Sequence, residues 1–265
     1  MIRLPTLFIS HGAPTFALAP GSAGEQLGRL GQQLPEPRAI LVVSPHWITD
    51  DIEVMTGLHP PTVHDFGGFP QALYQLRYPV DGHPQLAGTA AQLLAAAGYK
   101  VILNEQQGLD HGAWVPLLHL FPKGHVPVFQ VSMPADLTVQ GALDLGAALA
   151  PLREQGVLII GSGSMTHNLA EFRADGGEDA AYVQEFTLWI RAALLAGDLP
   201  RLIDYRTLAP HAQRAHPSEE HLLPLMVALG TAATPTAVQV LDGGITHGML
   251  AMESYVFGDL PSGTI

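Results

Sequence analysis

Short apolar runs recur along the chain, and most of them end in Ser, Gly or Pro. The runs richest in Val, Ile, Leu and Phe predict buried strands at residues 5–10, 39–45, 52–57, 126–133, 156–163 and 236–243. Such near-continuous apolar strands are typical of a sheet whose two faces are both covered. The pattern therefore predicts a buried central sheet.

Helical patterns lie between several of these runs. We expect helices over residues 22–34, 84–98, 136–156, 179–197 and 218–230. Pro84 near the start of the second segment and Gly98 at its end are typical helix boundary residues. Ser218 is the expected N-cap of the last helix.

Strands that alternate with helices predict an α/β fold with three layers, α/β/α, around a mostly parallel or mixed sheet. We find no repeat and no low-complexity linker, so residues 1–265 are expected to form a single catalytic domain. Residues 243–258 alternate in a β-like manner and predict one more strand late in the chain. The order of the strands does not follow from this pattern.

Composition narrows the range of partners and chemistries. The chain has 12 Lys and Arg against 24 Asp and Glu, so we expect neither nucleic acid nor an anionic membrane surface as a partner. The absence of cysteine excludes disulfides, thiolate nucleophiles and cysteine-based metal sites. No apolar run resembles a signal peptide or a membrane span, so we expect a soluble, cytoplasmic protein.

The 13 histidines outnumber all lysines and arginines, and histidine is here the remaining strong nitrogen ligand for a metal. His11, His46 and His167 each follow a predicted strand. Ligands bind at the carboxyl ends of strands in open α/β sheets, so these three side chains are expected to converge. His221, on the first turn of a predicted helix, can point into the same crevice.

Two loops offer further polar or aromatic groups. His111 lies in the predicted loop 108–114, where Asp110 can hydrogen-bond an imidazole or merely cap a turn. Residues 60–79 are rich in Pro, Gly and aromatic side chains, and Phe66, Phe69 and Tyr74 there either face a planar ligand or pin a long loop to the core. Trp47 and Trp114, close to proposed site residues in sequence, are further candidates for the walls of a pocket.

The other histidines carry weaker signals. His216 and His221 are both potential ligands in the segment 216–221, which lacks the His-Glu-x-x-His spacing of zinc proteases. We expect surface or packing roles for His59, His83, His119, His125, His211 and His247. Residues 161–167 match neither a phosphate-binding loop nor a nucleophile elbow, so a histidine-based metal site is the best physical interpretation.

Six motifs in register then point to a family. The segments ISHGAP, VVSPHW, HDFGGFPQALY, DHGAWVPL, GSGSMTHNL and EEHLLPL resemble the class III extradiol ring-cleavage dioxygenases, in particular their single-chain branch. The resemblance extends from residue 5 to about residue 256. It implies a non-haem iron(II) enzyme, with Zn²⁺ possible in the same site, that cleaves a DOPA-like or other small aromatic diol with O2.

The resemblance also implies roles for individual residues. His11, His46 and His221 match metal ligands, His111 matches a catalytic histidine, and His167 matches either a catalytic acid/base or a further metal ligand. Better-known relatives complete the ligand set with a glutamate, whereas this chain offers His221. An all-histidine site suits zinc as well as iron, which leaves the metal open.

Two alternatives remain at this point. The first is a zinc-dependent hydrolase in which the metal activates water and His167 shuttles protons. The second is a non-enzymatic, metal-binding relative, which the presence of both His111 and His167 argues against. The oligomeric state does not follow from the sequence.

Overall fold

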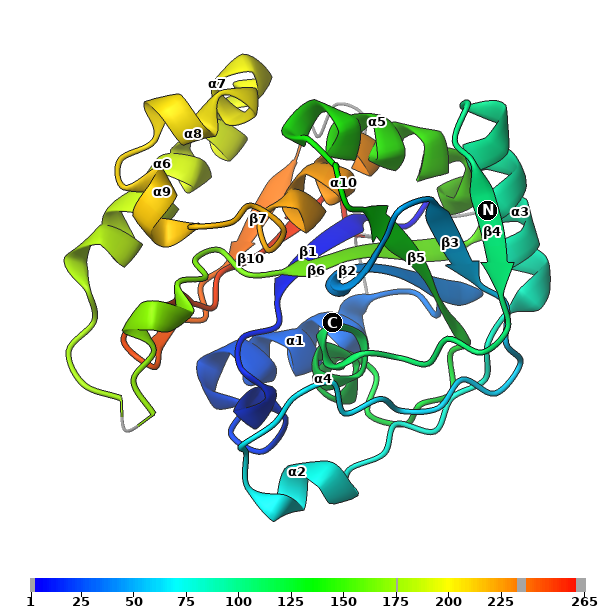
Figure 1. The fold of residues 1–265 in the computed structure, drawn as a ribbon, viewed down its shortest axis with the longest axis horizontal. Helices are drawn as coiled ribbons and strands as arrows, with labels where there is room; N and C mark the ends of the chain where they lie inside the picture. The colour runs from blue at the N-terminus through cyan, green and yellow to red at the C-terminus, as the bar shows by residue number, and fades with distance from the viewer. Residues whose placement is uncertain (1–2, 175, 233–236, 261–265) are drawn as a thin grey trace.

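The computed structural model describes residues 3–174, 176–232 and 237–260, and its centre is an eight-stranded sheet (Figure 1). The strand order is β4-β3-β5-β2-β6-β1-β10-β7. The strands are β1 (Thr6–Ser10), β2 (Ala39–Thr49), β3 (Ile52–Met55), β4 (Val101–Asn104), β5 (Val128–Pro134), β6 (Val157–Gly163), β7 (Val238–Leu241) and β10 (Ser254–Phe257). A separate two-stranded ribbon pairs β8 (Ile245–Thr246) with β9 (Leu250–Ala251).

The middle of the sheet is parallel and its flanks are not. β5, β2, β6 and β1 run parallel to one another, whereas β10 is antiparallel to both β1 and β7. On the other side β3 is antiparallel to β5 and parallel to β4. The expected mixed sheet is confirmed, and the carboxyl ends of β1, β2 and β6 lie at one edge.

Helices cover both faces of this sheet (Figure 1). On one face lie α1 (Gly21–Gln33) and α4 (His111–Leu120), which pack on each other, and α4 contacts β2. The other face carries α3 (Pro84–Ala96), α5 (Val139–Leu149) and α10 (Leu223–Ala232). This arrangement confirms the three-layer prediction, and it explains why the central strands are apolar at almost every position.

Shorter elements complete the fold. Beyond the sheet edge lie α6 (Ala181–Ala196), α7 (Leu199–Ile203), α8 (Tyr205–Leu208) and α9 (Ala212–Ala215), while α2 (Gln71–Gln75) lies in the long loop before α3 (Figure 1). Three 3-10 segments are η1 (Pro14–Ala17), η2 (Ala150–Gln155) and η3 (Leu169–Glu171). None of the helices in the described part of the chain is both long and apolar enough to cross a membrane.

Several predicted boundaries differ from the structure. The helix expected over 136–156 ends at Leu149 and continues as 3-10 turns, because Pro151 has no backbone N–H for the helical ladder. The helix expected over 218–230 begins only at Leu223, so Ser218 is not its N-cap. β4 was not predicted: although residues 101–103 are apolar, the strand has only four residues, and none of them is fully buried at this edge of the sheet. Of the strand predicted over 236–243, Thr236 lies outside the described residues.

Candidate metal centre

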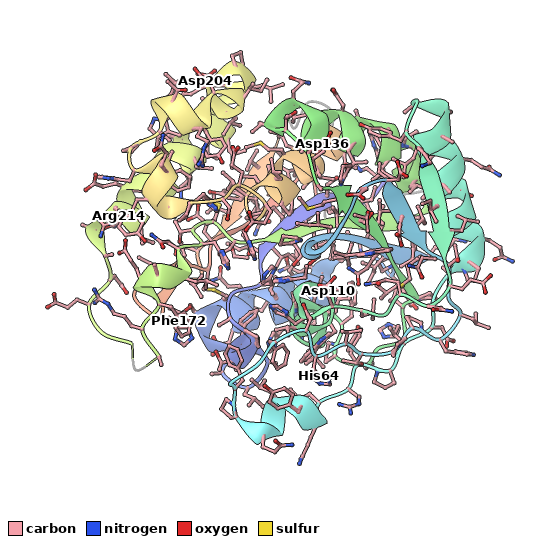
Figure 2. The ribbon with its side chains drawn as sticks, in the orientation of Figure 1. His64, Asp110, Asp136, Phe172, Asp204 and Arg214 are labelled. Atoms are coloured by element: carbon pink, nitrogen blue, oxygen red, sulfur yellow. The ribbon has the colours of Figure 1, made fainter. Side chains whose placement is uncertain are left out.

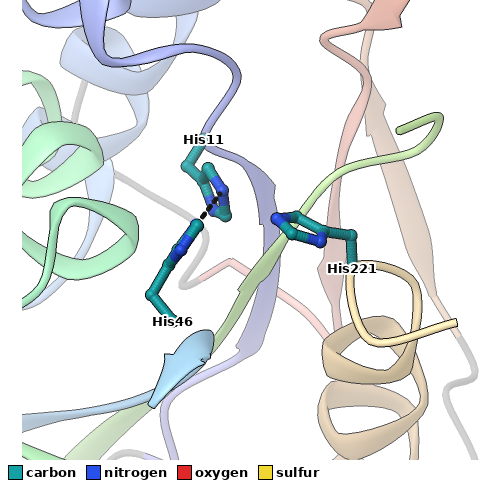
Figure 3. A group of neighbouring side chains, drawn as sticks. All are labelled: His11, His46 and His221. Carbon is teal, nitrogen blue, oxygen red and sulfur yellow. Dashed lines mark hydrogen bonds between the residues drawn. The ribbon is translucent and has the colours of Figure 1, made fainter. Parts of the chain in front are cut away.

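Three imidazoles from separate segments meet at the carboxyl edge of the sheet. His11 directly follows β1, His46 lies in the part of β2 where the register with β5 is interrupted, and His221 lies in the turn before α10 (Figure 3). One ring nitrogen from each lies within 4.8 Å of the others. The sequence placed His221 on the first turn of the helix. The structure places it just before the helix, with its ring in the predicted crevice.

Glycines allow these segments to approach closely. A Cβ on Gly163 would lie 2.2 Å from the carbonyl oxygen of His221, so only glycine lets the His221 turn rest on β6. Ser164 fixes that turn by donating its backbone N–H to the same carbonyl at 2.8 Å. After His11 the chain turns through Gly12 at φ +61°, a conformation that favours glycine.

Hydrogen bonds of Nδ1 in two of the rings fix the direction in which Nε2 of each ring points. The Ser162 hydroxyl donates to the Gly112 carbonyl, so it accepts a hydrogen bond from Nδ1–H of His11 at 3.0 Å. Nδ1 of His221 lies 3.0 Å from a Glu220 carboxylate oxygen and donates to it. In both rings Nε2 is consequently the nitrogen with the lone pair.

These lone pairs point at a common place. Nε2 of His221 is buried and has no hydrogen-bond partner within the described chain. Nε2 of His11 lies 3.1 Å from Nε2 of His46, whose other nitrogen lies 3.5 Å from a carboxylate oxygen of Asp65. Two nitrogens bound to one metal ion at about 2 Å each lie about 3 Å apart. The donor set and its spacing therefore fit a bound divalent cation.

Two more imidazoles border the same place. The ring of His167 stacks on that of His221, with centroids 3.4 Å apart and planes at 8°. The centroid of His111 lies 3.9 Å from that of His46. All five histidines that the sequence singled out are thus brought together.

The environment disfavours the protonated form of four of these imidazoles, those of His11, His46, His167 and His221. Burial and the neighbouring imidazoles lower the pKa values of His11 and His221 well below their usual range. Burial first, and the neighbouring His111 second, lower the pKa of His46 to about 3. Burial also lowers the pKa of His167. Neutral imidazole is the form that coordinates a metal, so no proton has to leave before an ion can bind.

Asp65 is a site residue that sequence reasoning missed. Its carboxylate accepts hydrogen bonds from Nδ1 and from the backbone N–H of His111, both at 2.9 Å. Although burial raises the pKa of this carboxyl, the hydrogen bonds from His111 outweigh it and the pKa is lowered. The available signal was a lone carboxylate inside the Gly- and aromatic-rich segment 60–79.

Of the two roles considered for Asp110, the structure shows that of a cap. It caps α4 by accepting the N–H of Ala113, and it also bonds Ser44 and Gln130. His111 is accordingly the first residue of a helix rather than a loop residue. Figure 2 shows Asp110 beside α4, under the sheet.

The remaining histidines lie outside the cluster. His64, in the loop below Asp110 in Figure 2, pairs with the backbone carbonyl of Leu76. His216 is buried and bonds the Met165 carbonyl, so it is not a ligand of the centre. His83 caps α3 by accepting the N–H of Leu86.

A cavity of about 320 Å³ opens onto the histidine cluster. It is lined by His11, Gly12, Ala13, Pro14, His46, Phe66, Phe69, His111, His167, Leu169, Phe172, His221 and Leu250. Of the two roles left open for Phe66 and Phe69, the structure shows that both line the cavity, and Phe66 also packs against the core. Tyr74 instead packs on Phe66, with ring centroids 5.3 Å apart. Trp47 and Trp114 are core residues rather than pocket walls, because both are buried away from the lining.

The layered fold and the histidine cluster under an apolar cavity are those of an α/β protein with a site that could hold a metal ion. Residues 6–258 match the family described as the catalytic LigB subunit of aromatic ring-opening dioxygenase. The chain belongs to this family and is an extradiol dioxygenase that opens the ring of a catechol-type substrate.

Individual relatives agree with this assignment. Proteins named 4,5-DOPA dioxygenase extradiol are 39% identical in Beta vulgaris, over 95% of this chain and 96% of that protein, and 34% identical in Escherichia coli K12, over 97% and 95%. The crystal structure of an uncharacterized protein from Escherichia coli K12 superimposes with a TM-score of 0.81 and is 28% identical. It covers 97% of this chain and 100% of its own.

Proposed function

We propose that His11, His46 and His221 hold iron(II) in the active enzyme, and that the site cleaves a DOPA-like or other small catechol with O2. The observation that carries the proposal is the convergence on one point of three imidazoles with lowered pKa values, two of them buried and that of His46 partly exposed. The names of the plant and bacterial relatives support the substrate class. A bound ion would supply Lewis acidity toward the two catechol oxygens and open coordination positions for the substrate and O2.

The other two histidines act on protons. We assign to His167 the removal of a proton from a catechol hydroxyl, because its ring lies over His221 at the cavity wall. His111, whose Nδ1–H donates to Asp65, lines the same cavity and would take up and return a proton at Nε2. A general acid or base of this kind contributes about a hundredfold to ten-thousandfold in rate.

We also propose that residues 1–265 act as one catalytic domain, whose partners are the aromatic diol and O2. The cytoplasmic location expected from the sequence stays a prediction. A zinc-dependent hydrolase is the second candidate, because an all-histidine donor set suits zinc as well as iron. The family assignment does not favour that candidate or a non-enzymatic metal-binding role.

Metal exchange tests the proposal directly. The protein is stripped of metal, reloaded anaerobically with iron(II) or zinc, and given DOPA, catechol or 3,4-dihydroxybenzoate. Oxygen uptake with iron alone, together with a new absorbance band of a ring-opened product, is the expected result. Stoichiometric iron binding without uptake of oxygen on any of these diols contradicts it.

His167→Ala tests the division of roles. If His167 is an acid/base, the variant keeps one iron per chain and turns over about a hundredfold or more slowly. Loss of the iron from this variant would instead make His167 a ligand. The matched control is His125→Ala, an exposed histidine outside the cavity lining.

A further inference from the structure

Phe172 lines the cavity over the histidine cluster, but its own segment holds it only weakly. The residue follows the three-residue segment η3, and its backbone N–H bonds the Leu169 carbonyl at a long 3.3 Å. Arg173 and Ala174, which come next, are exposed. A segment with so few internal contacts depends on another part of the chain to fix the position of its side chains.

His247 provides this support from outside the cavity. Its ring stacks on that of Phe172, with centroids 4.5 Å apart and planes at 24°, while His247 itself is not part of the cavity lining. Nδ1–H of His247 donates to the Arg173 carbonyl at 3.1 Å, and the His247 carbonyl accepts from the Arg173 backbone N–H at 3.2 Å. His247 thus fixes both backbone groups of the residue that follows Phe172.

The same imidazole contacts a second part of the lining. Its Nε2 lies 3.3 Å from the hydroxyl oxygen of Thr15, in η1. Ala13 and Pro14, directly before Thr15, line the cavity on the segment that follows His11. His247 therefore joins two parts of the cavity wall that are far apart in the sequence.

The backbone at His247 is unusual for a residue with a side chain. Within the described chain only two residues other than glycine have φ in the left-handed region, His247 at +54° and His211 at +57°. His247 lies in the turn between β8 and β9, before Gly248 at φ +70°, where Asn or Gly is the common residue. Such a conformation persists where surrounding contacts fix it, and here these are the contacts to the two parts of the lining.

We propose that His247 is a positioning residue that sets the width of the cavity between Phe172 and the segment 13–14. This inference rests on the proposed function, because the substrate is taken to be the flat ring of a catechol. The position of the Phe172 ring then determines how tightly that ring is held. Since His247 acts on the wall and not on the histidine cluster, its effect belongs in KM rather than in kcat.

His247→Asn tests the inference in the iron-loaded enzyme. Asparagine adopts the left-handed conformation readily, so the turn is kept while the ring stack is lost. We expect KM for a catechol to rise by about threefold to tenfold, the range that one aromatic contact typically contributes, with kcat within about twofold and one iron per chain. An unchanged KM, or a loss that appears mainly in kcat, overturns the inference.

The matched control is His211→Asn. It makes the same substitution at nearly the same φ, at an exposed histidine that pairs with Glu185 and lies outside the lining. KM should not change in this variant. An equal rise in KM would show that the effect of His247→Asn does not pass through the cavity wall.

Two further variants test the two contacts separately. Phe172→Leu keeps an apolar wall but removes the ring, so adding His247→Asn to it should raise KM by at most about twofold more. Thr15→Val removes only the hydroxyl and should raise KM by about twofold. Independent, multiplying effects of the Phe172 and His247 changes contradict the action through Phe172. An unchanged KM in Thr15→Val contradicts the link to the second wall.

Binding of 4-nitrocatechol to the zinc-loaded protein separates this inference from ring cleavage. The absorbance of this ligand changes when its hydroxyls ionise at a metal, so a titration gives Kd without turnover. We expect His247→Asn to raise this Kd by the same factor as KM. If the unchanged protein does not bind the ligand, the proposed catechol site is wrong and this inference falls with it. If both proteins bind it equally, the catechol site stands and only the positioning role of His247 is wrong.

Discussion

Two polar clusters contact the end of β1. They differ in whether their donors and acceptors form hydrogen bonds with one another. One is the histidine cluster of the candidate metal centre. The other joins Arg191, Glu253 and Tyr255: the guanidinium and the phenol both donate to the Glu253 carboxylate, which is only 2% exposed. The Ser10 hydroxyl, one residue before His11, donates to the backbone carbonyl of Glu253 and links the two.

The comparison shows what an incomplete polar cluster means. In the arginine cluster donors meet acceptors, and the Glu253 hydrogen bonds and charge raise the pKa of Arg191. In the histidine cluster bare nitrogens meet one another, and Nε2 of His221 has no partner among the described residues. Buried polar groups are normally satisfied, so the arginine cluster is complete in itself, whereas the histidine cluster is one that a bound cation would complete.

The largest effect is expected for His46→Ala. Because this change removes one of three convergent nitrogens, iron binding should fall well below one per chain and oxygen uptake should fall by about a thousandfold or more. Metal analysis and oxygen uptake measure the two effects. His59→Ala is the control, because His59 is exposed and pairs only with Asp81. Full iron occupancy with activity close to that of the unchanged protein would contradict the assignment of His46.

Arg191→Leu tests the satisfied cluster in the same way. It leaves the buried Glu253 carboxylate without its cation, so we expect a loss of about 3 kcal/mol in the free energy of unfolding. Urea denaturation measures this loss, and the metal content of the folded protein should not change. The double variant Arg191→Leu/Glu253→Gln should recover most of the loss. Equal losses in the single and double variants would show that no buried charge was left unpaired.

The same contrast shows how far the sequence predicts this site. His11 and His46 could be placed because they follow continuous apolar strands, and parallel strands bring their carboxyl ends to one edge. Asp65 could not be placed, because it lies in a long loop whose path depends on packing against α4. The Arg191–Glu253 pair joins residues 62 positions apart and leaves no local pattern.

In the fold, likewise, elements with many buried residues were predicted and elements with few were missed. β1 and β6 were predicted because every one of their residues is buried, so the pattern is continuous. β4 and the short helices α7 to α9 were missed because few buried positions mark them. His221 was assigned to a helix because the apolar pattern of α10 begins beside it. The structure holds this residue in a turn through the close contact of its carbonyl with Gly163.

His216 provides a smaller effect, on stability against pH. Burial lowers the pKa of this imidazole to about 4, while Nε2–H donates to the Met165 carbonyl and Nδ1 has no partner within the described chain. The unfolded chain therefore takes up the proton near pH 6.5, before the folded state does. The stabilisation is present above that pH and is lost as the pH falls toward 4.

The expected size of this effect can be measured by difference. Between pH 7 and pH 5, His216 should account for about 2 kcal/mol of the loss in the free energy of unfolding. Urea denaturation of the unchanged protein and of His216→Gln at both pH values isolates this part, because the other histidines are common to both proteins. Identical pH dependence in the two proteins would show that His216 is not held neutral by the fold.

Asp65→Asn should give the smallest effect of the four changes. It decides whether Asp65 belongs to the histidine cluster. The amide keeps the shape of the carboxylate and can still accept from His111, but it removes the negative charge beside His111 and His46. Partners that orient site histidines typically contribute about 10- to 100-fold in activity or metal affinity, and this conservative change should lie near tenfold. Because Asp65 acts through other residues, the decrease should appear in kcat with iron still bound, and the pH profile of kcat should shift.

The control for the change in net charge is Glu105→Gln, because Glu105 is an exposed carboxylate in another loop. If Asp65→Asn lowers stability as Arg191→Leu does and leaves kcat and its pH profile unchanged, Asp65 belongs with the satisfied cluster. Asp65 would then have to be left out of the incomplete histidine cluster.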